Sequence, residues 1–148
     1  METIENPLGT DGFEFVEFTS PDPDGMARIF ETLGFTAYAK HPTRDIVRYK
    51  QGDINLLLNR EPQGQAARFR AEHGPSANGM AFRVKDAKKA FEMAIERGAK
   101  PTDAAPTALG AGAYTLEGIG GSVLYLVDRY GDEGTIYDDW QQIPGAAE

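Results

Sequence analysis

The run Phe-Glu-Phe-Val-Glu-Phe occupies residues 13–18 and decides the first element of the fold. Aromatic and β-branched residues favour a strand. Strand alternation puts the odd-numbered residues, with Glu17, on one face and the even-numbered residues, with Glu14, on the other. A Ser-Pro-Asp-Pro run then ends the strand, and apolar residues at helical spacing follow from Asp22 to a closing glycine, Gly34. The chain therefore opens with a strand followed by a helix.

The stretch after Gly34 predicts a group of short strands at residues 35–40, 45–50 and 53–59, with a turn at Gly52. Residues 61–73 are weakly amphipathic and predict a short helix. Before the first strand, residues 1–11 are expected to be an extended lead-in.

A second strand and helix follow the same plan. Met80, Phe82 and Val84 alternate, Asp86 is a good helix N-cap, and an apolar stripe leads to Gly98. A loop rich in Ala, Gly and Pro at 101–112 precedes strands at 114–119 and 122–128. Residues 131–148 look like a polar tail with an aromatic pair, Tyr137 and Trp140.

The two halves match at an offset of 64 residues. The matched pairs are Val16 and Met80, Phe18 and Phe82, Asp22 and Asp86, Met26 and Ala90, and Gly34 and Gly98. One strand–helix–strands unit leaves an apolar sheet face uncovered, so two units should pack together. The sequence predicts an α+β fold in which duplicated β-α-β-β-β modules form an open, curved mixed sheet. The whole chain, 1–148, is expected to be one domain with modules at about 10–70 and 75–130 and a linker segment at 131–148.

Composition narrows the classes of function. The chain has 148 residues, 15 Lys and Arg against 23 Asp and Glu, and a formal charge of −8. This balance argues against nucleic acid or an anionic membrane as a partner, because phosphate contacts need clustered positive charge. With no cysteine, disulfides, thiolate metal sites and a cysteine nucleophile are excluded. No apolar run approaches a bilayer span, and the acidic start is unlike a signal peptide. We expect a cytoplasmic protein.

Several runs spread along the chain closely resemble the N-terminal domain of bacterial 4-hydroxyphenylpyruvate dioxygenases, in the vicinal oxygen chelate or glyoxalase–bleomycin resistance superfamily. The runs are Gly12-Phe-Glu-Phe-Val-Glu-Phe, Gln51-Gly-Asp-Ile-Asn-Leu-Leu-Leu-Asn, Ala71-Glu-His-Gly-Pro-Ser, Gly79-Met-Ala-Phe-Arg-Val-Lys-Asp and Gly118-Ile-Gly-Gly-Ser-Val-Leu-Tyr-Leu-Val-Asp-Arg. The resemblance extends from about Asn6 to Trp140.

The resemblance implies a non-catalytic half of a larger enzyme of tyrosine catabolism. Enzymes of this family carry a second, C-terminal domain in which two His and one Glu hold a non-haem Fe(II). They convert 4-hydroxyphenylpyruvate and O₂ into homogentisate and CO₂. We therefore expect a scaffold and oligomerisation domain, inactive alone, with the catalytic domain of the same polypeptide as its partner, in a homo-oligomer. No cofactor is expected in this chain, and Fe(II) is expected in the other domain.

The residues of the chain agree with this expectation. A 2-His-1-carboxylate site needs both histidines, but His41 and His73 are predicted in unrelated loops. We expect His41 to be exposed and His73 to bond nearby backbone. We therefore predict no catalytic, cofactor-binding or metal-binding residue.

By resemblance, metal ligands in the superfamily usually lie on the first and last strands of each module. The matching positions here are Glu14, Asn78 or Gly79, and Tyr125. One carboxylate among them does not make a divalent metal site. A buried Glu14 should be paired with an arginine or partly solvated, since a buried unpaired carboxylate is costly. A remnant ligand or substrate contact is the alternative for Glu14.

Other motifs have structural readings. The glycine-rich run 118–121 has no helix after it, so we interpret it as a tight hairpin rather than a phosphate cradle. Asp86 is interpreted as a helix cap. The acidic residues at 132–133 and 138–139 are expected to be solvated, with Tyr137 and Trp140 anchoring this segment on the sheet.

Alternative functions remain open at this point. The chain could be a stand-alone, metal-free protein of the same superfamily that binds small molecules. It could belong to a hydroxymandelate synthase-like enzyme, which shares the domain. A small metal-dependent enzyme of the glyoxalase type is disfavoured by the number of available ligands.

Overall fold

A computed structural model describes residues 4–103 and 106–146. Parts of three predicted segments, residues 1–3, 104–105 and 147–148, lie outside the described residues. The first module contains β1 (Thr10–Thr19), α1 (Pro23–Thr32), β2 (Thr36–Lys40), β3 (Ile46–Gln51) and β4 (Ile54–Asn59). The strands and helix predicted for this half are confirmed, and Gly52 forms the turn between β3 and β4 with a φ of 56°.

The second module follows a connecting helix. The connecting helix is α2 (Gln65–His73), and the elements of the second module are β5 (Ser76–Val84), α3 (Ala87–Glu96), β6 (Tyr114–Glu117), a 3-10 turn η1 (Ile119–Gly121) and β7 (Val123–Val127). Within the described part of the chain, a short extended segment at residues 100–102 is the counterpart of β2 in the second module. It makes a single bridge, between Pro101 and Leu116, and backbone hydrogen bonds to β6.

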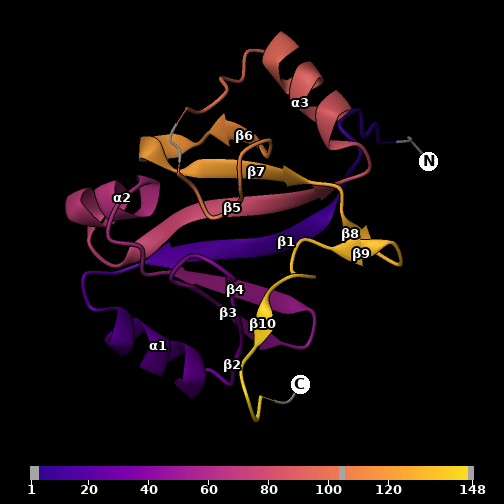
Figure 1. Cartoon of the computed structure of the whole chain (residues 1–148). Helices are drawn as coiled ribbons and strands as arrows, with labels where there is room; N and C mark the ends of the chain where they lie inside the picture. The colour runs from indigo at the N-terminus through magenta and orange to yellow at the C-terminus, as the bar shows by residue number, and fades with distance from the viewer. Residues whose placement is uncertain (1–3, 104–105, 147–148) are drawn as a thin grey trace.

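The modules join into one mixed sheet through their first strands. The order among the described strands is β10-β2-β3-β4-β1-β5-β7-β6, where β10 is Gln141–Gln142 (Figure 1). Strand β1 is antiparallel to β5, β4 is parallel to β1, and β7 is parallel to β5. The predicted α+β fold with an open mixed sheet is confirmed.

Helices α1 and α3 cover what we call the outer face of the sheet. Phe30 of α1 packs on Tyr49 and Leu58, and Ala90 and Ala94 of α3 pack in a cluster with Val84 and Leu126. Both helices begin at the predicted caps: the Asp22 side chain accepts from the Gly25 amide and Asp86 from the Lys89 amide. These equivalent caps keep the repeat visible in the structure.

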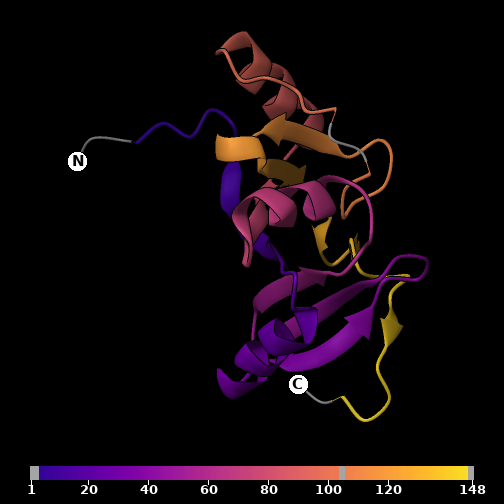
Figure 2. The same ribbon diagram turned by 90° about the vertical axis from the view of Figure 1, so that its left-hand side faces the viewer.

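The opposite, inner face carries a second apolar core. Its buried residues are Phe15, Ile46, Leu57, Ala81, Ala108, Val123, Tyr125, Val127 and Tyr137. The C-terminal segment crosses this side through β8 (Tyr130–Gly131), β9 (Gly134–Thr135) and β10 (Gln141–Gln142), and β10 pairs with β2. Figure 2 shows β10 and the loop before β6 on the side of the molecule opposite the N-terminal lead-in.

Bulges between β1 and β5 change which side chains reach the inner face. Phe13 pairs with Phe82 but Phe15 pairs with Ala81, so Glu14 is an extra residue in β1. The Phe13 ring packs on Phe82, which belongs with the outer cluster. The predicted alternation is therefore wrong at this point. The bulge turns Phe13 outward and Glu14 inward, although strict alternation would do the reverse.

A further bulge acts on β5. Glu17 pairs with Gly79 and Phe18 pairs with Ala77, which leaves Asn78 as the extra residue. Its buried amide bonds to Glu17, whose side chain also lies on the inner face. Two bulges thus each direct an additional polar side chain to the inner core, and these two residues, Glu14 and Asn78, are among the positions matched to superfamily metal ligands.

Candidate functional site

The centre of the inner face is a buried polar network around Glu17, a residue for which the sequence analysis suggested no role. The Tyr125 hydroxyl donates to Glu17 Oε1 at 2.6 Å, and the Asn59 and Asn78 amides donate to Oε2 at 2.9 and 2.7 Å. The Glu17 side chain is fully buried. Three donors from three different strands therefore hold one carboxylate in place.

The network continues into α2 and the neighbouring turn. The Asn78 amide also donates to Gln65 Oε1 at 2.9 Å. The Gln65 amide donates to the backbone carbonyls of Asn78 and Gly121 at 3.0 and 2.9 Å. Gln65 is buried at the start of α2, so this network also fixes the helix on the end of the sheet.

Burial governs the titration of this network. Loss of solvent raises the pKa of Glu17, and the hydrogen bonds from Tyr125, Asn59 and Asn78 lower it in part. Burial and the adjacent Glu17 carboxylate raise the pKa of Tyr125 well above its ordinary value. The Tyr125 proton therefore stays on the phenol and serves as a hydrogen-bond donor.

Gly79 allows the network to pack closely. A Cβ atom at this position would lie 3.0 Å from Glu17 Oε1, 3.1 Å from the Tyr125 ring and 3.2 Å from the Val123 carbonyl oxygen. The absence of a side chain therefore lets Glu17 and Tyr125 meet across β5.

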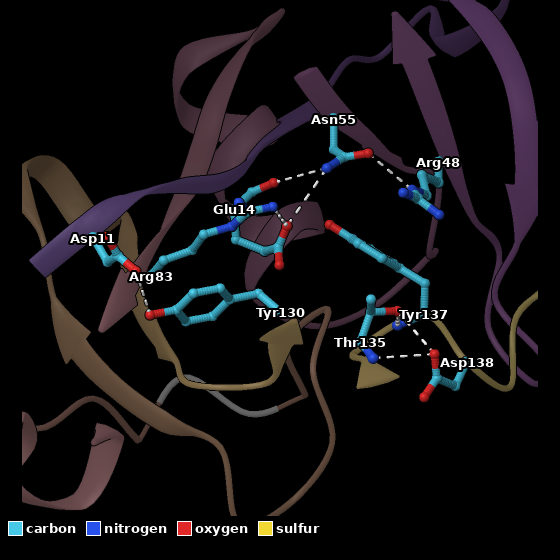
Figure 3. Close-up of polar contacts among 9 residues, drawn as sticks. All are labelled: Asp11, Glu14, Arg48, Asn55, Arg83, Tyr130, Thr135, Tyr137 and Asp138. Carbon is cyan, nitrogen blue, oxygen red and sulfur yellow. Dashed lines mark hydrogen bonds and ion pairs between the residues drawn. The ribbon is translucent and has the colours of Figure 1, made fainter. Parts of the chain in front are cut away.

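A second polar group on the inner face, which we call the Glu14 cluster, consists of Glu14, Arg48, Asn55, Arg83 and Tyr137 (Figure 3). Arg83 pairs with Glu14 Oε2 at 3.1 Å. The Asn55 amide donates to the Glu14 backbone carbonyl at 3.1 Å, and Arg48 Nε donates to Asn55 Oδ1 at 2.9 Å. The predicted pairing of Glu14 with an arginine is confirmed.

Tyr137 joins the Glu14 cluster to the apolar inner core. Its side chain is only 6% exposed, and the Arg48 guanidinium lies 3.8 Å from the centroid of its ring. Burial and the Glu14 carboxylate raise the pKa of Tyr137 far above that of a free phenol. The Trp140 ring packs edge-on against Tyr137 at 5.4 Å. The predicted anchoring of this segment on the sheet by Tyr137 and Trp140 is confirmed.

The histidines lie away from these carboxylates. His73 is the last residue of α2, not a loop residue, and its Nε2 bonds the Gly120 carbonyl oxygen at 3.2 Å, as expected of a backbone partner. His41 is half-buried rather than exposed, because its ring packs on Trp140 at 5.0 Å. Its Nδ1 accepts from the Thr43 and Arg44 amides. Burial, then the charge of Arg44, lowers the pKa of His41.

The side chains of the inner face that could bind a metal do not fit an iron centre. Both Glu17 oxygens accept from neutral donors, and Glu14 Oε2 is paired with Arg83. Among the described residues no three His, Cys, Asp or Glu side chains gather in a way that could hold a metal ion. Asn78 and Tyr125 from the matched positions do reach this face, but they bond to Glu17, and Gly79 contributes no side chain.

The remaining motifs have structural roles. The run 118–121 forms the turn before β7, with Gly120 and Gly121 at positive φ and the Gly118 amide bonded to the Ser122 carbonyl. Asp138 accepts from the Thr135 amide and pairs with Arg129 at 2.9 Å. These contacts hold the two turns in place.

A surface cavity of about 670 Å³ lies between the start of α3 and the loop before β6. Small side chains and backbone from residues 109–113 form much of its wall. Asp128 at its edge accepts from the Ala87 amide at 2.9 Å and so caps the start of α3.

None of the described helices is long and apolar enough to span a bilayer.

The buried position of Glu17 was not predicted, because a glutamate in an alternating strand normally indicates a solvated face. One signal in the chain could have found it. Polar residues also end or interrupt the apolar strands beside it, at Asn55, Asn59 and Asn78. Asparagine is depleted in strands, so three of them in strand positions indicate buried hydrogen-bonding partners.

Known proteins match the chain over most of its length. The family model for the N-terminal part of hydroxyphenylpyruvate dioxygenase matches residues 4–141. A 4-hydroxyphenylpyruvate dioxygenase of Pseudomonas sp. (strain P.J. 874) is 50% identical over 137 residues, which are 93% of this chain and 38% of that protein. The enzyme of the same name from Pseudomonas aeruginosa is 49% identical over 144 residues, covering 95% of this chain and 40% of that protein.

Solved structures agree with this match. A fusion protein of a xylose isomerase-like TIM barrel with a 4-hydroxyphenylpyruvate dioxygenase superimposes with a TM-score of 0.82 at 30% identity, over 94% of this chain and 23% of that one. This chain therefore spans about two fifths or less of the length of these relatives. The chain belongs to the family of hydroxyphenylpyruvate dioxygenase N-terminal domains.

Proposed function

We propose that this chain is the non-catalytic N-terminal domain of a 4-hydroxyphenylpyruvate dioxygenase. The whole enzyme would convert 4-hydroxyphenylpyruvate and O₂ into homogentisate and CO₂ in tyrosine catabolism, in the cytoplasm. Its Fe(II) would lie in a second domain of the same polypeptide, where two His and one Glu hold it. The observation that carries the proposal is the roughly 50% identity to enzymes of that name, along a chain that covers 38% and 40% of them.

The chemistry of the inner face supports a structural role. A metal-dependent dioxygenase needs ligands with free lone pairs and open coordination positions. Here Glu17 is saturated by three donors and Glu14 is paired with an arginine. These groups hold strands and α2 together, so the domain would contribute rigidity and contacts to the catalytic domain and to other subunits of a homo-oligomer.

The test begins with the coding sequence. We expect the reading frame to encode a second domain after this one, and its full product to consume O₂ with Fe(II) and 4-hydroxyphenylpyruvate. The 148-residue chain alone should neither retain Fe(II) after gel filtration nor consume O₂. A frame without a second domain, or O₂ consumption by the 148-residue chain, would contradict the proposal.

Variants of the full product separate a scaffold from a catalytic part. Replacing His73 by Asn or Glu14 by Gln should leave kcat within about twofold, provided that the circular dichroism spectrum shows an intact fold. A tenfold loss of kcat with an unchanged spectrum, equivalent to about 1.4 kcal/mol in the activation barrier, would indicate that the inner face takes part in catalysis.

Light scattering of the same protein measures the number of subunits in the proposed homo-oligomer.

A further inference from the structure

Tyr137 reaches the inner core from a segment whose backbone pairs with the sheet at one end, while its side chains add the Tyr130–Asp11 hydrogen bond and the packing of Ile136 and Trp140 on the core. We call residues 130–142 the strap. Its β8–β9 hairpin pairs only with itself among the described strands, and its β10 end pairs with β2 through Gln141 and Gln142. Between these two points, Tyr137 is the buried residue of the strap. The strap therefore places one aromatic ring onto the sheet face from outside, as a bound ligand would be placed.

The surroundings of the ring form a cradle with an apolar base and a charged rim. Phe15, Ala81 and Tyr125 belong to the core cluster in which the ring lies. Arg48 covers the ring at 3.8 Å from its centroid, which is a favourable cation–π contact. Figure 3 shows the hydroxyl end of Tyr137 directed toward the Glu14 carboxylate.

The Tyr137 hydroxyl makes no hydrogen bond to the polar end of the cradle. Among the described residues, the Tyr137 hydroxyl, Glu14 Oε1 and Arg83 Nε are buried and have no hydrogen-bond partner. Tyr125 in the same core is different, because its hydroxyl donates to Glu17 and accepts from the Ala108 amide. Buried polar atoms are normally paired, since an unpaired one loses its hydration without compensation. Tyr137 thus fits the cradle with its ring but leaves the acceptor at its end unused.

We propose that the cradle formed by Glu14, Arg48 and Arg83 is a binding site for a small phenol, and that Tyr137 fills it in cis. The aromatic ring of the ligand lies under the Arg48 guanidinium, and its hydroxyl donates to Glu14 Oε1. Strap and ligand exclude one another, so ligand enters only when the strap is lifted from the sheet. This site is independent of the proposed scaffold function.

The test replaces Tyr137 by Ala in the 148-residue chain and adds p-cresol, which is the tyrosine side chain as a free molecule. Trp140 is the single tryptophan of the chain and packs on Tyr137, so its fluorescence reports events in the cradle. We expect p-cresol to change this fluorescence saturably and to raise the melting temperature of Y137A. Toluene, which lacks the hydroxyl, should bind at least about tenfold more weakly, as expected for loss of a hydrogen bond to a carboxylate.

Two controls connect binding to the cradle. The double variant Y137A/E14L should bind p-cresol and toluene equally, because the acceptor is gone. The wild-type chain should show no change in Trp140 fluorescence at the same p-cresol concentration. Equal binding of the two ligands by Y137A, or no response of folded Y137A to p-cresol, would overturn the proposal.

A variant that does not fold still gives an answer. Binding to the native state alone draws the folding equilibrium toward that state. If Y137A is unfolded, p-cresol should restore its circular dichroism spectrum, and toluene at equal concentration should restore it less. Failure of p-cresol to restore the spectrum would equally overturn the proposal.

Discussion

Glu17 is a carboxylate without a charged partner at the centre of the molecule, stabilised by three neutral donors. Replacement by Gln keeps the shape and one acceptor, and the Tyr125 hydroxyl can accept from the new amide. We expect E17Q to change the free energy of unfolding by less than about 1.5 kcal/mol. Replacement by Leu leaves three buried donors unpaired and should cost about 3 kcal/mol or more. Urea denaturation at pH 7 measures both changes.

The same pair of variants shows whether Glu17 titrates with folding. Its pKa is raised in the folded state above the ordinary 4.5, so the folded protein binds the proton more tightly than the unfolded chain. The stability that Glu17 contributes is therefore present below about pH 4.5 and decreases as the pH rises toward the folded-state pKa. E17Q should lack this decrease. Parallel pH profiles for E17Q and wild type above pH 4.5 would contradict the assignment.

The stability that His41 contributes should depend on pH in the opposite direction. Burial lowers its pKa below the ordinary 6.5, so its contribution to stability is present above about pH 6.5 and is lost as the pH falls through the folded-state pKa. His41→Asn keeps an acceptor for the Thr43 and Arg44 amides but does not titrate. We expect wild type to lose more stability than H41N between pH 7.5 and 5.5 in urea denaturation. His73→Asn is the matched control for replacing a histidine by asparagine elsewhere in the chain.

At the residue scale, the sequence predicted the partner of Glu14 but not its face. Pairing followed from charge, because a buried carboxylate requires a cation or donors. The face on which Glu14 lies depends on a bulge in the pairing of β1 with β5. This bulge cannot be seen in the alternation of apolar and polar residues along β1. Glu17 was overlooked for a related reason, since its three donors come from strands far apart in sequence.

The two helices give a matched test at the scale of elements. Asp22 and Asp86 cap α1 and α3 in the same way, with 3.1 and 3.0 Å bonds to the amides three residues later. Replacing either by Ala should destabilise the protein by about 1 kcal/mol. The double variant should show the sum, because the two caps share no partner. A cost confined to one helix, measured by urea denaturation, would show that the repeat is not energetically symmetric.

Elements were predictable where local signals were strong. Caps, apolar stripes and Gly34 and Gly98 located both helices, and Gly52 located a hairpin. The strap was predicted as a polar tail because its strands have two residues each and depend on partners elsewhere in the chain. The reduced counterpart of β2 at residues 100–102 likewise carries no strand pattern.

At the scale of the whole molecule, the strap closes the inner face. Removal of residues 130–148 would delete the buried Tyr137 and uncover Phe15 and the other members of the Glu14 cluster. We expect a loss of at least 3 kcal/mol, the usual cost of removing a core aromatic ring, together with binding of the dye ANS. Removal of residues 143–148 alone is the control and should cost less than about 1 kcal/mol. Equal stability of the two truncated chains would show that the strap is dispensable.

The whole architecture was predictable because the duplication indicates how the elements pair, which the local sequence pattern does not. Two strand–helix units in register require a shared sheet, whichever residues form its edges. The distribution of polar groups inside that sheet was not predictable, since it depends on bulges and on one tyrosine brought in by the strap.

The seam between β1 and β5 has a kinetic consequence. Val16 pairs with Leu56 on one side and Met80 on the other, so the central strand cannot complete its pairing until the chain as far as β5 has been gathered. Topologies with such distant pairings fold in roughly milliseconds to seconds, more slowly than helical bundles. In stopped-flow refolding, circular dichroism should follow this assembly. Because Trp140 lies on the strap, its fluorescence should report the arrival of the C-terminal segment on the sheet.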